Sequence, residues 1–110
     1  MGNKNAALED YNEAIKINPK NADYYSNRGA LLSKIGKDLK QAEEDLTKSI
    51  KLDGSDPDKY LTRAIIYCKE NLYLAAIDDL NILLNMDSDN KQARELRSYA
   101  IKSLTHEQEF

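Results

Sequence analysis

The sequence predicts an all-α protein of about six antiparallel helices, and three observations lead to this prediction. Apolar residues recur at three- and four-residue spacing, which places them on one face of a helix. No segment alternates apolar and polar residues with the period of two that is typical of a strand. A segment of about 34 residues repeats along the chain, as it does in stacked helical hairpins.

The first helix is expected over residues 5–17 and the second over residues 22–35. Asn18-Pro19 ends the first helix, because proline has no amide hydrogen and forces the residue before it out of the α region. Asn21 is a suitable N-cap for the second helix, and Gly36 suits the left-handed residue that ends it.

The third helix is expected over residues 39–52, with Asp38 as N-cap and Gln41 in a capping-box arrangement. The fourth helix is expected over residues 57–70, with Asp56 as N-cap. Pro57 suits its first position, because the amide hydrogen that proline lacks would be unpaired there anyway. Gly54 and Asn71 are expected to end these two helices.

The last two helices are expected over residues 73–86 and 91–104. The segment Asp87-Ser88-Asp89-Asn90 between them is rich in turn and cap residues. Residues 105–110 are expected to be frayed.

Composition excludes several classes of partner. The length of 110 residues fits one domain, and the net charge of -3 argues against nucleic acid, whose binding needs a basic stripe. No apolar run has transmembrane length and no signal peptide opens the chain, so no membrane partner is expected. The single Cys68 excludes an internal disulfide and favours a reducing, cytoplasmic location.

Three segments of the chain match one another residue by residue: 7–11, 42–46 and 76–80. The expected helices that precede segments 42–46 and 76–80 also match each other. In them, Tyr25, Arg28, Gly29 and Lys34 correspond to Tyr60, Arg63, Ala64 and Lys69. Tyr25 and Gly29 share one helix face, and the glycine lets another helix approach closely. The offset is 35 residues from Ala7 to Ala42 and 34 residues from Ala42 to Ala76, so one extra residue is expected around Lys37-Asp38-Leu39.

These residues resemble the tetratricopeptide repeat (TPR) family, whose 34-residue unit carries an aromatic residue, Leu-Gly, Tyr, Ala, an aromatic and Pro in order. Tyr25, Gly29 and Ala42 match this pattern in one unit, and Tyr60 and Ala76 match it in the next. The resemblance implies a right-handed solenoid of helical hairpins that forms a single domain over residues 1–110. Its parts are half a repeat over residues 1–21, full repeats over 22–56 and 57–90, and a capping helix with a tail over 91–110.

The sequence departs from the family pattern at several positions. Leu46 and Leu80 replace the second aromatic, and Gly54 and Ser88 replace Pro. The large Leu83 stands at the position of the smaller Ala14 and Ser49. It is therefore expected to push the last helix outward. Gly2 matches Gly36, which suggests a fragment of a longer array; the alternative is a protein that begins with an unpaired helix. Leu8, Tyr11, Ile15 and Ile17 are therefore expected to be partly exposed or to contact a partner chain, which favours a homodimer through this helix.

Catalysis, metal binding and cofactor binding have little support. The single His106 lies in the tail, so a hydrolase triad has no well-placed base. The acidic groups Glu9-Asp10, Glu43-Glu44-Asp45 and Asp78-Asp79 fit a solvated helix face, and Cys68 fits a small packing residue. No phosphate loop or metal-ligand pattern occurs, so no enzyme, metal or cofactor is expected.

The resemblance implies a concave groove that binds a peptide or a helical segment of a partner protein, lined by the first helix of each hairpin. The implied residues are Asp23, Ser26, Asn27, Ala30, Ser33, Lys34, Asp58, Leu61, Thr62, Ile65 and Lys69, with Glu95 and Tyr99 following. Asn27 can offer amide hydrogens to a peptide, and Lys34 and Lys69 can place two ammonium groups along one wall. The alternative is that Asn27 is an ordinary polar residue and the lysines are only solvated.

The leading prediction is a non-enzymatic adaptor, and the alternative is a structural segment of a longer or self-associating array. Some members of the family clamp the C-terminal carboxylates of heat-shock chaperones, and residues 24–28 resemble the second repeat of that clamp. The clamp also needs Lys and Arg where this chain has Asp58 and Thr62. An aspartate there repels a carboxylate, so this ligand is not favoured.

Overall fold

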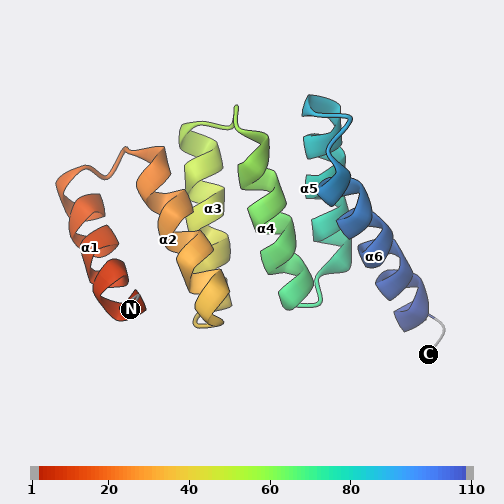
Figure 1. Cartoon of the computed structure of the whole chain (residues 1–110), viewed down its shortest axis with the longest axis horizontal. Coiled ribbons are helices and arrows are strands. Elements are labelled where there is room, and N and C mark those ends of the chain that lie inside the picture. The colour runs from red at the N-terminus through yellow and green to blue at the C-terminus, as the bar shows by residue number, and fades with distance from the viewer. Residues whose placement is uncertain (1–2, 109–110) are drawn as a thin grey trace. The chain divides into compact units, whose positions relative to one another are not determined.

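The computed structural model describes residues 3–108, with side chains described through His106. Its helices, shown in Figure 1, are α1 (Lys4–Ile17), α2 (Ala22–Ile35), α3 (Leu39–Leu52), α4 (Pro57–Lys69), α5 (Tyr73–Met86) and α6 (Lys91–Gln108). Residues 3–108 contain no strand, so the all-α prediction is confirmed.

The chain divides into two compact units, Met1–Ser55 and Asp56–Phe110. The first unit contains α1, α2 and α3, the second contains α4, α5 and α6, and successive helices within each unit run antiparallel (Figure 1). The division lies within one residue of the expected repeat boundary after residue 56. A single domain over residues 1–110 stays a prediction.

Side-chain caps begin the helices where the sequence predicts them. The Asn21 side chain accepts a hydrogen bond of 2.9 Å from the amide of Asp23, and Asp56 accepts one of 2.9 Å from the amide of Asp58. These bonds satisfy amides that have no partner in the first turn of a helix. Gly36 has a φ of +66° and ends α2 in the predicted left-handed conformation.

The turn with the extra residue differs in detail from the capping box that the sequence predicts. Asp38 accepts from the amide of Gln41 at 3.0 Å, as expected. The Gln41 side chain does not return a bond to the Asp38 amide. It lies along α3 instead, where its Nε2 donates to Asp45 Oδ1 at 3.0 Å. Asp38 also has a φ of +53°, a conformation that aspartate tolerates better than most residues.

The prediction that the tail is frayed from residue 105 is wrong for residues 105–108, which continue α6. The Thr105 hydroxyl donates to the carbonyl of Ile101 at 2.9 Å, and no proline or glycine follows Asn90 to stop the helix. The predicted match of Gly2 to Gly36, and the predicted fraying of residues 109–110, lie outside the described residues.

The two full hairpins, α2–α3 and α4–α5, bury matching positions. Ala42, Leu46 and Ser49 are fully buried on α3, and Ala76, Leu80 and Leu83 are fully buried on α5. Leu83 belongs to a core cluster with Ala93 of α6, so a large residue in α5 is accommodated beside a small one in α6.

Gly29 confirms the predicted close approach of two helices. A Cβ built there would lie 2.9 Å from the backbone carbonyl oxygen of Ala42 and 3.0 Å from the Cβ of Asp45. Since the backbone of α3 cannot move aside cheaply, the hairpin α2–α3 requires glycine at this position.

A bidentate ion pair closes each full hairpin. Arg28 donates through Nε and Nη2 to the Asp45 carboxylate at 2.8 and 2.7 Å, and Arg63 donates in the same way to Asp79 at 2.7 and 2.6 Å. The hydrogen bond to its aspartate raises the pKa of each arginine above its ordinary value, so both stay charged. The partners are 17 residues apart in the first pair and 16 in the second, as the extra turn residue requires.

Candidate functional site

In the first unit, three predicted groove residues gather around one hollow. Asn27, Ala30 and Lys34 of α2 line a surface cavity of about 270 Å³ together with Ala7, Tyr11 and Leu31. The Asn27 and Lys34 side chains are exposed, so an amide and an ammonium group border an otherwise apolar hollow. This combination suits a ligand with both polar and apolar groups.

The other predicted residues of α2 contribute less to this hollow. Asp23 is exposed at the start of the helix, and the Ser26 hydroxyl donates back to the Asp23 carbonyl at 3.2 Å. Ser33, by contrast, is buried, so its assignment to the groove is wrong. The neighbouring Leu32 is also buried, which places this side of α2 toward α3 rather than toward solvent.

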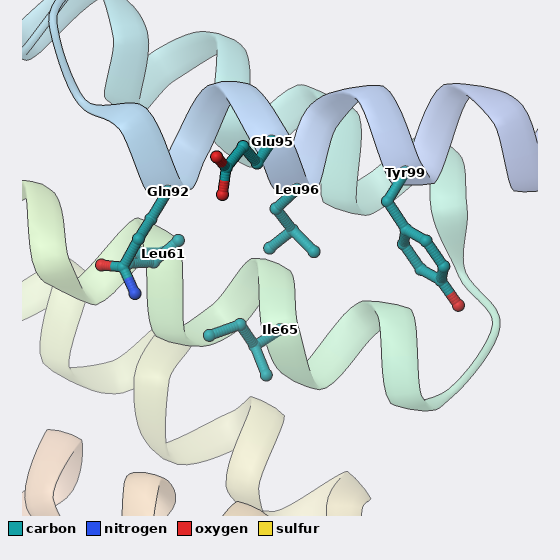
Figure 2. A pocket seen from close by; sticks show the side chains of 6 residues that line it. All are labelled: Leu61, Ile65, Gln92, Glu95, Leu96 and Tyr99. Carbon is teal, nitrogen blue, oxygen red and sulfur yellow. The ribbon is translucent and has the colours of Figure 1, made fainter.

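In the second unit, a cavity of about 340 Å³ lies between α4 and α6. Figure 2 shows Leu61 and Ile65 on α4 facing α6, with Leu96 pointing from α6 toward Ile65. The remaining lining residues are Gln92, Glu95 and Tyr99. An aliphatic floor with an amide, a carboxylate and a phenol at its edge matches the usual composition of a ligand pocket.

Tyr99 is held in place by a second aromatic ring. Its ring lies 6.2 Å from that of Tyr73, with an angle of 75° between the ring planes. Edge-to-face contacts of this kind are favourable, and Tyr73 itself is buried. The exposed Tyr99 ring is therefore presented to the cavity in a defined orientation.

The structure separates the predicted residues of α4 into two groups. Leu61 and Ile65 line the cavity, whereas Asp58, Thr62 and Lys69 do not. The Thr62 hydroxyl donates to the Asp58 carbonyl at 3.0 Å, so its proton is already used within the helix. An incoming carboxylate would find an exposed aspartate and no free hydroxyl donor here.

Sequence reasoning missed two cavity residues, Gln92 and Leu96. The repeat register contains the signal that would identify them, because they stand at the positions of Asp58 and Thr62 in the preceding unit.

Comparison with known proteins identifies the repeat. Residues 1–36 match a family model described as a TPR repeat. The structure resembles the Arabidopsis OM64 TPR domain with a TM-score of 0.84 and 33% sequence identity, covering 90% of this chain and 81% of that domain. The chain belongs to the TPR family.

Two further proteins are similar to this chain over most of its length. The second TPR domain of human RPAP3, solved in complex with the HSP70 peptide SGPTIEEVD, has a TM-score of 0.82 and 30% identity, covering 88% of this chain and 80% of that one. DnaJ homolog subfamily C member 7 of Homo sapiens is 42% identical over 82 residues, which is 71% of this chain. The chain spans only 16% of the length of that relative.

The groups that would support other chemistry are sparse in this TPR fold. Among residues 3–108, no cluster of three or more histidine, cysteine or acidic side chains is placed to hold a metal ion, and no helix is long and apolar enough to cross a membrane. Burial raises the pKa of the Cys68 thiol above its ordinary value, which keeps it protonated at neutral pH. A protonated, half-buried thiol fits a packing role.

Proposed function

We propose that this chain is a non-enzymatic protein-interaction module that binds a peptide segment of a partner protein. The observation that carries the proposal is the cavity between α4 and α6, where apolar side chains from two helices face one another. The RPAP3 domain, which resembles this chain over most of its length, was solved with a bound peptide and supports the same use.

The geometry favours an apolar side chain of the peptide as the anchor. Ile65 is 37% exposed, so a peptide side chain that packs on it would remove apolar surface of Ile65 from water. This burial favours binding by roughly 25 cal/mol per Å² of apolar surface. The Gln92 amide and the Tyr99 hydroxyl can then bond the peptide backbone at the edge of the cavity. In the first unit, Asn27 and Lys34 offer a second, more polar contact surface.

The alternative function is a structural segment of a longer TPR array. The chain covers only 16% of the length of DnaJ homolog subfamily C member 7, which favours this alternative. A cytoplasmic location is proposed on the basis of the free Cys68 thiol.

The experiment uses peptides selected from a random library against the immobilised full chain. Binding of a selected, labelled peptide is measured by fluorescence anisotropy. Ile65→Lys is expected to weaken binding at least about tenfold, because it places a charge in an apolar anchor site.

Ile82→Lys on α5 is the matched control, since Ile82 is 41% exposed and does not line the cavity. Circular dichroism establishes that both variants remain helical. If no selected peptide distinguishes Ile65→Lys from Ile82→Lys, the α4–α6 cavity is not the binding site.

A further inference from the structure

The first and last helices carry complementary halves of one hairpin contact. The repeat register places Asp10 of α1 at the position of Asp45 and Asp79, and Arg97 of α6 at the position of Arg28 and Arg63. Asp45 and Asp79 are buried in their ion pairs. Asp10 is exposed, and among the described residues its side chain has no bonded partner.

Arg97 already takes the position of a hairpin arginine. Its Nη1 donates to Asn81 Oδ1 at 2.9 Å, just as Arg28 Nη1 donates to Asn12 Oδ1 at 2.9 Å, and the two asparagines are equivalent in the repeat. Arg28 uses its remaining Nε and Nη2 to bind a carboxylate. In the described part of the chain, Arg97 has no carboxylate partner for those two atoms.

The apolar positions around the two charges are complementary as well. Ala7, Tyr11 and Ala14 of α1 are only partly buried, although their counterparts in α3 and α5 are fully buried. On α6, Ser98 is exposed and Ile101 is 47% exposed, whereas their counterparts Gly29 and Leu32 in α2 are buried against α3. α6 thus has the face of a first hairpin helix, and α1 has the face of a second.

We propose that the partner of α1 is α6 of a second copy of this chain. Arg97 of one copy would bind Asp10 of the next, and Ser98 and Ile101 would lie over Ala7, Tyr11 and Ala14. The docked helix would partly fill the cavity of about 270 Å³ that Ala7 and Tyr11 border. The two hairpins within the chain show the Arg–Asp pair of this contact twice, in the same register.

This contact is head to tail, because it joins different surfaces of the two copies. Such a contact leaves one α1 and one α6 available in every open assembly, so the assembly extends by further copies or closes into a ring. It uses Arg97, Ser98 and Ile101 of α6, whereas the α4–α6 cavity uses Gln92, Glu95, Leu96 and Tyr99. The two proposals overlap only at the cavity that Ala7 and Tyr11 border, and they can fail separately because the peptide test uses Ile65 at the other cavity.

The test measures the average mass of the 110-residue chain by sedimentation velocity over a range of concentrations. We expect the mass to rise with concentration past that of two chains. Asp10→Arg alone or Arg97→Asp alone should weaken self-association at least about tenfold, because each places like charges together. Mixing the two variants restores opposite charges at every contact and should restore association.

Glu9→Arg is the matched control, since Glu9 is exposed, as are its counterparts Glu44 and Asp78. Ile101→Lys is a second variant that tests the apolar part of the contact without removing the bond of Arg97 to Asn81. A strict monomer, a mass that stops at two chains, or equal effects of Asp10→Arg and Glu9→Arg would overturn the proposal. Failure of the mixture to recover association, with both variants folded by circular dichroism, would overturn it too.

Discussion

Gly29 and Ser98 occupy the same position on two helices in very different surroundings. At Gly29 the backbone of α3 lies within contact distance of the missing side chain. At Ser98 the side chain is exposed. Within the chain, a helix covers this repeat position in α2 but not in α6, so a side chain added there meets a packing limit only at Gly29.

We expect Gly29→Ala to lower the free energy of unfolding. Alanine is favoured over glycine in a helix by about 1 kcal/mol, but overpacking a close helix contact costs about 1–3 kcal/mol. The added Cβ meets the backbone carbonyl oxygen of Ala42 as well as the end of the Leu46 side chain. Leu46 can turn aside but the backbone cannot, so we expect the packing cost to exceed the gain. Urea denaturation followed by circular dichroism measures the difference. Ser98→Ala is the control, and it should leave stability unchanged or slightly higher.

The conformation of Asp38 shows what a residue pattern does not reveal. Its capping role is readable from the sequence, because aspartate precedes a helix and Gln41 follows three residues later. The partner of the Gln41 side chain is Asp45, which is one turn further along α3, and the residue pattern does not mark the positive φ of Asp38. The caps were therefore predictable and the bonding around them was not.

Each full hairpin depends on an arginine that is surrounded by several groups. Arg63 pairs with Asp79 and lies 5.9 Å and 5.8 Å from the ring centroids of Tyr60 and Tyr67. Both rings add to the attraction for the positive charge. Because the folded pKa of Arg63 is raised, its contribution to stability is complete below the unfolded pKa and is lost only in strong alkali.

We expect Asp79→Asn to lower the free energy of unfolding by about 3–5 kcal/mol, because it leaves a largely buried guanidinium without its counter-charge. The neighbouring Asp78→Asn is the control, since Asp78 is exposed, and its effect should stay within about 0.5 kcal/mol. Chemical denaturation at pH 7 measures both. Equal effects of the two substitutions would show that the ion pair does not stabilise the hairpin.

Helix bounds were predictable because the chain marks most of them with proline, glycine or a cap residue. The bounds of α2, α3 and α5 agree with the sequence prediction at both ends. The end of α6 was not predictable, because no such residue follows Asn90. The cavity was predictable on α4 from the family resemblance, but Gln92 and Leu96 required knowing that α6 continues the same register.

At the scale of the whole molecule, the charges along the proposed groove select among ligands. The RPAP3 domain was solved with a peptide that ends in Glu-Glu-Val-Asp. In this chain, exposed Asp58 and internally bonded Thr62 stand where a carboxylate clamp needs cations. We therefore expect a different peptide to be the natural ligand.

We expect labelled SGPTIEEVD to bind the unmodified chain more weakly than about 1 mM. Asp58→Lys combined with Thr62→Arg should tighten binding by about tenfold or more, because two cations replace a repelling charge and an occupied hydroxyl. Fluorescence anisotropy at two salt concentrations measures both, and the gain should shrink at high salt. Micromolar binding by the unmodified chain would show that the acidic terminus is accepted by other residues.

The location of the Arg–Asp pair inside each hairpin bears on how such a chain can grow or be shortened during evolution. A duplication or deletion that begins and ends between hairpins carries both partners together and leaves no unmatched charge. A break within a hairpin separates the arginine from its aspartate and leaves one on each fragment. Whole hairpins are therefore the fragments that can be gained, lost or moved into another gene without a second, compensating mutation.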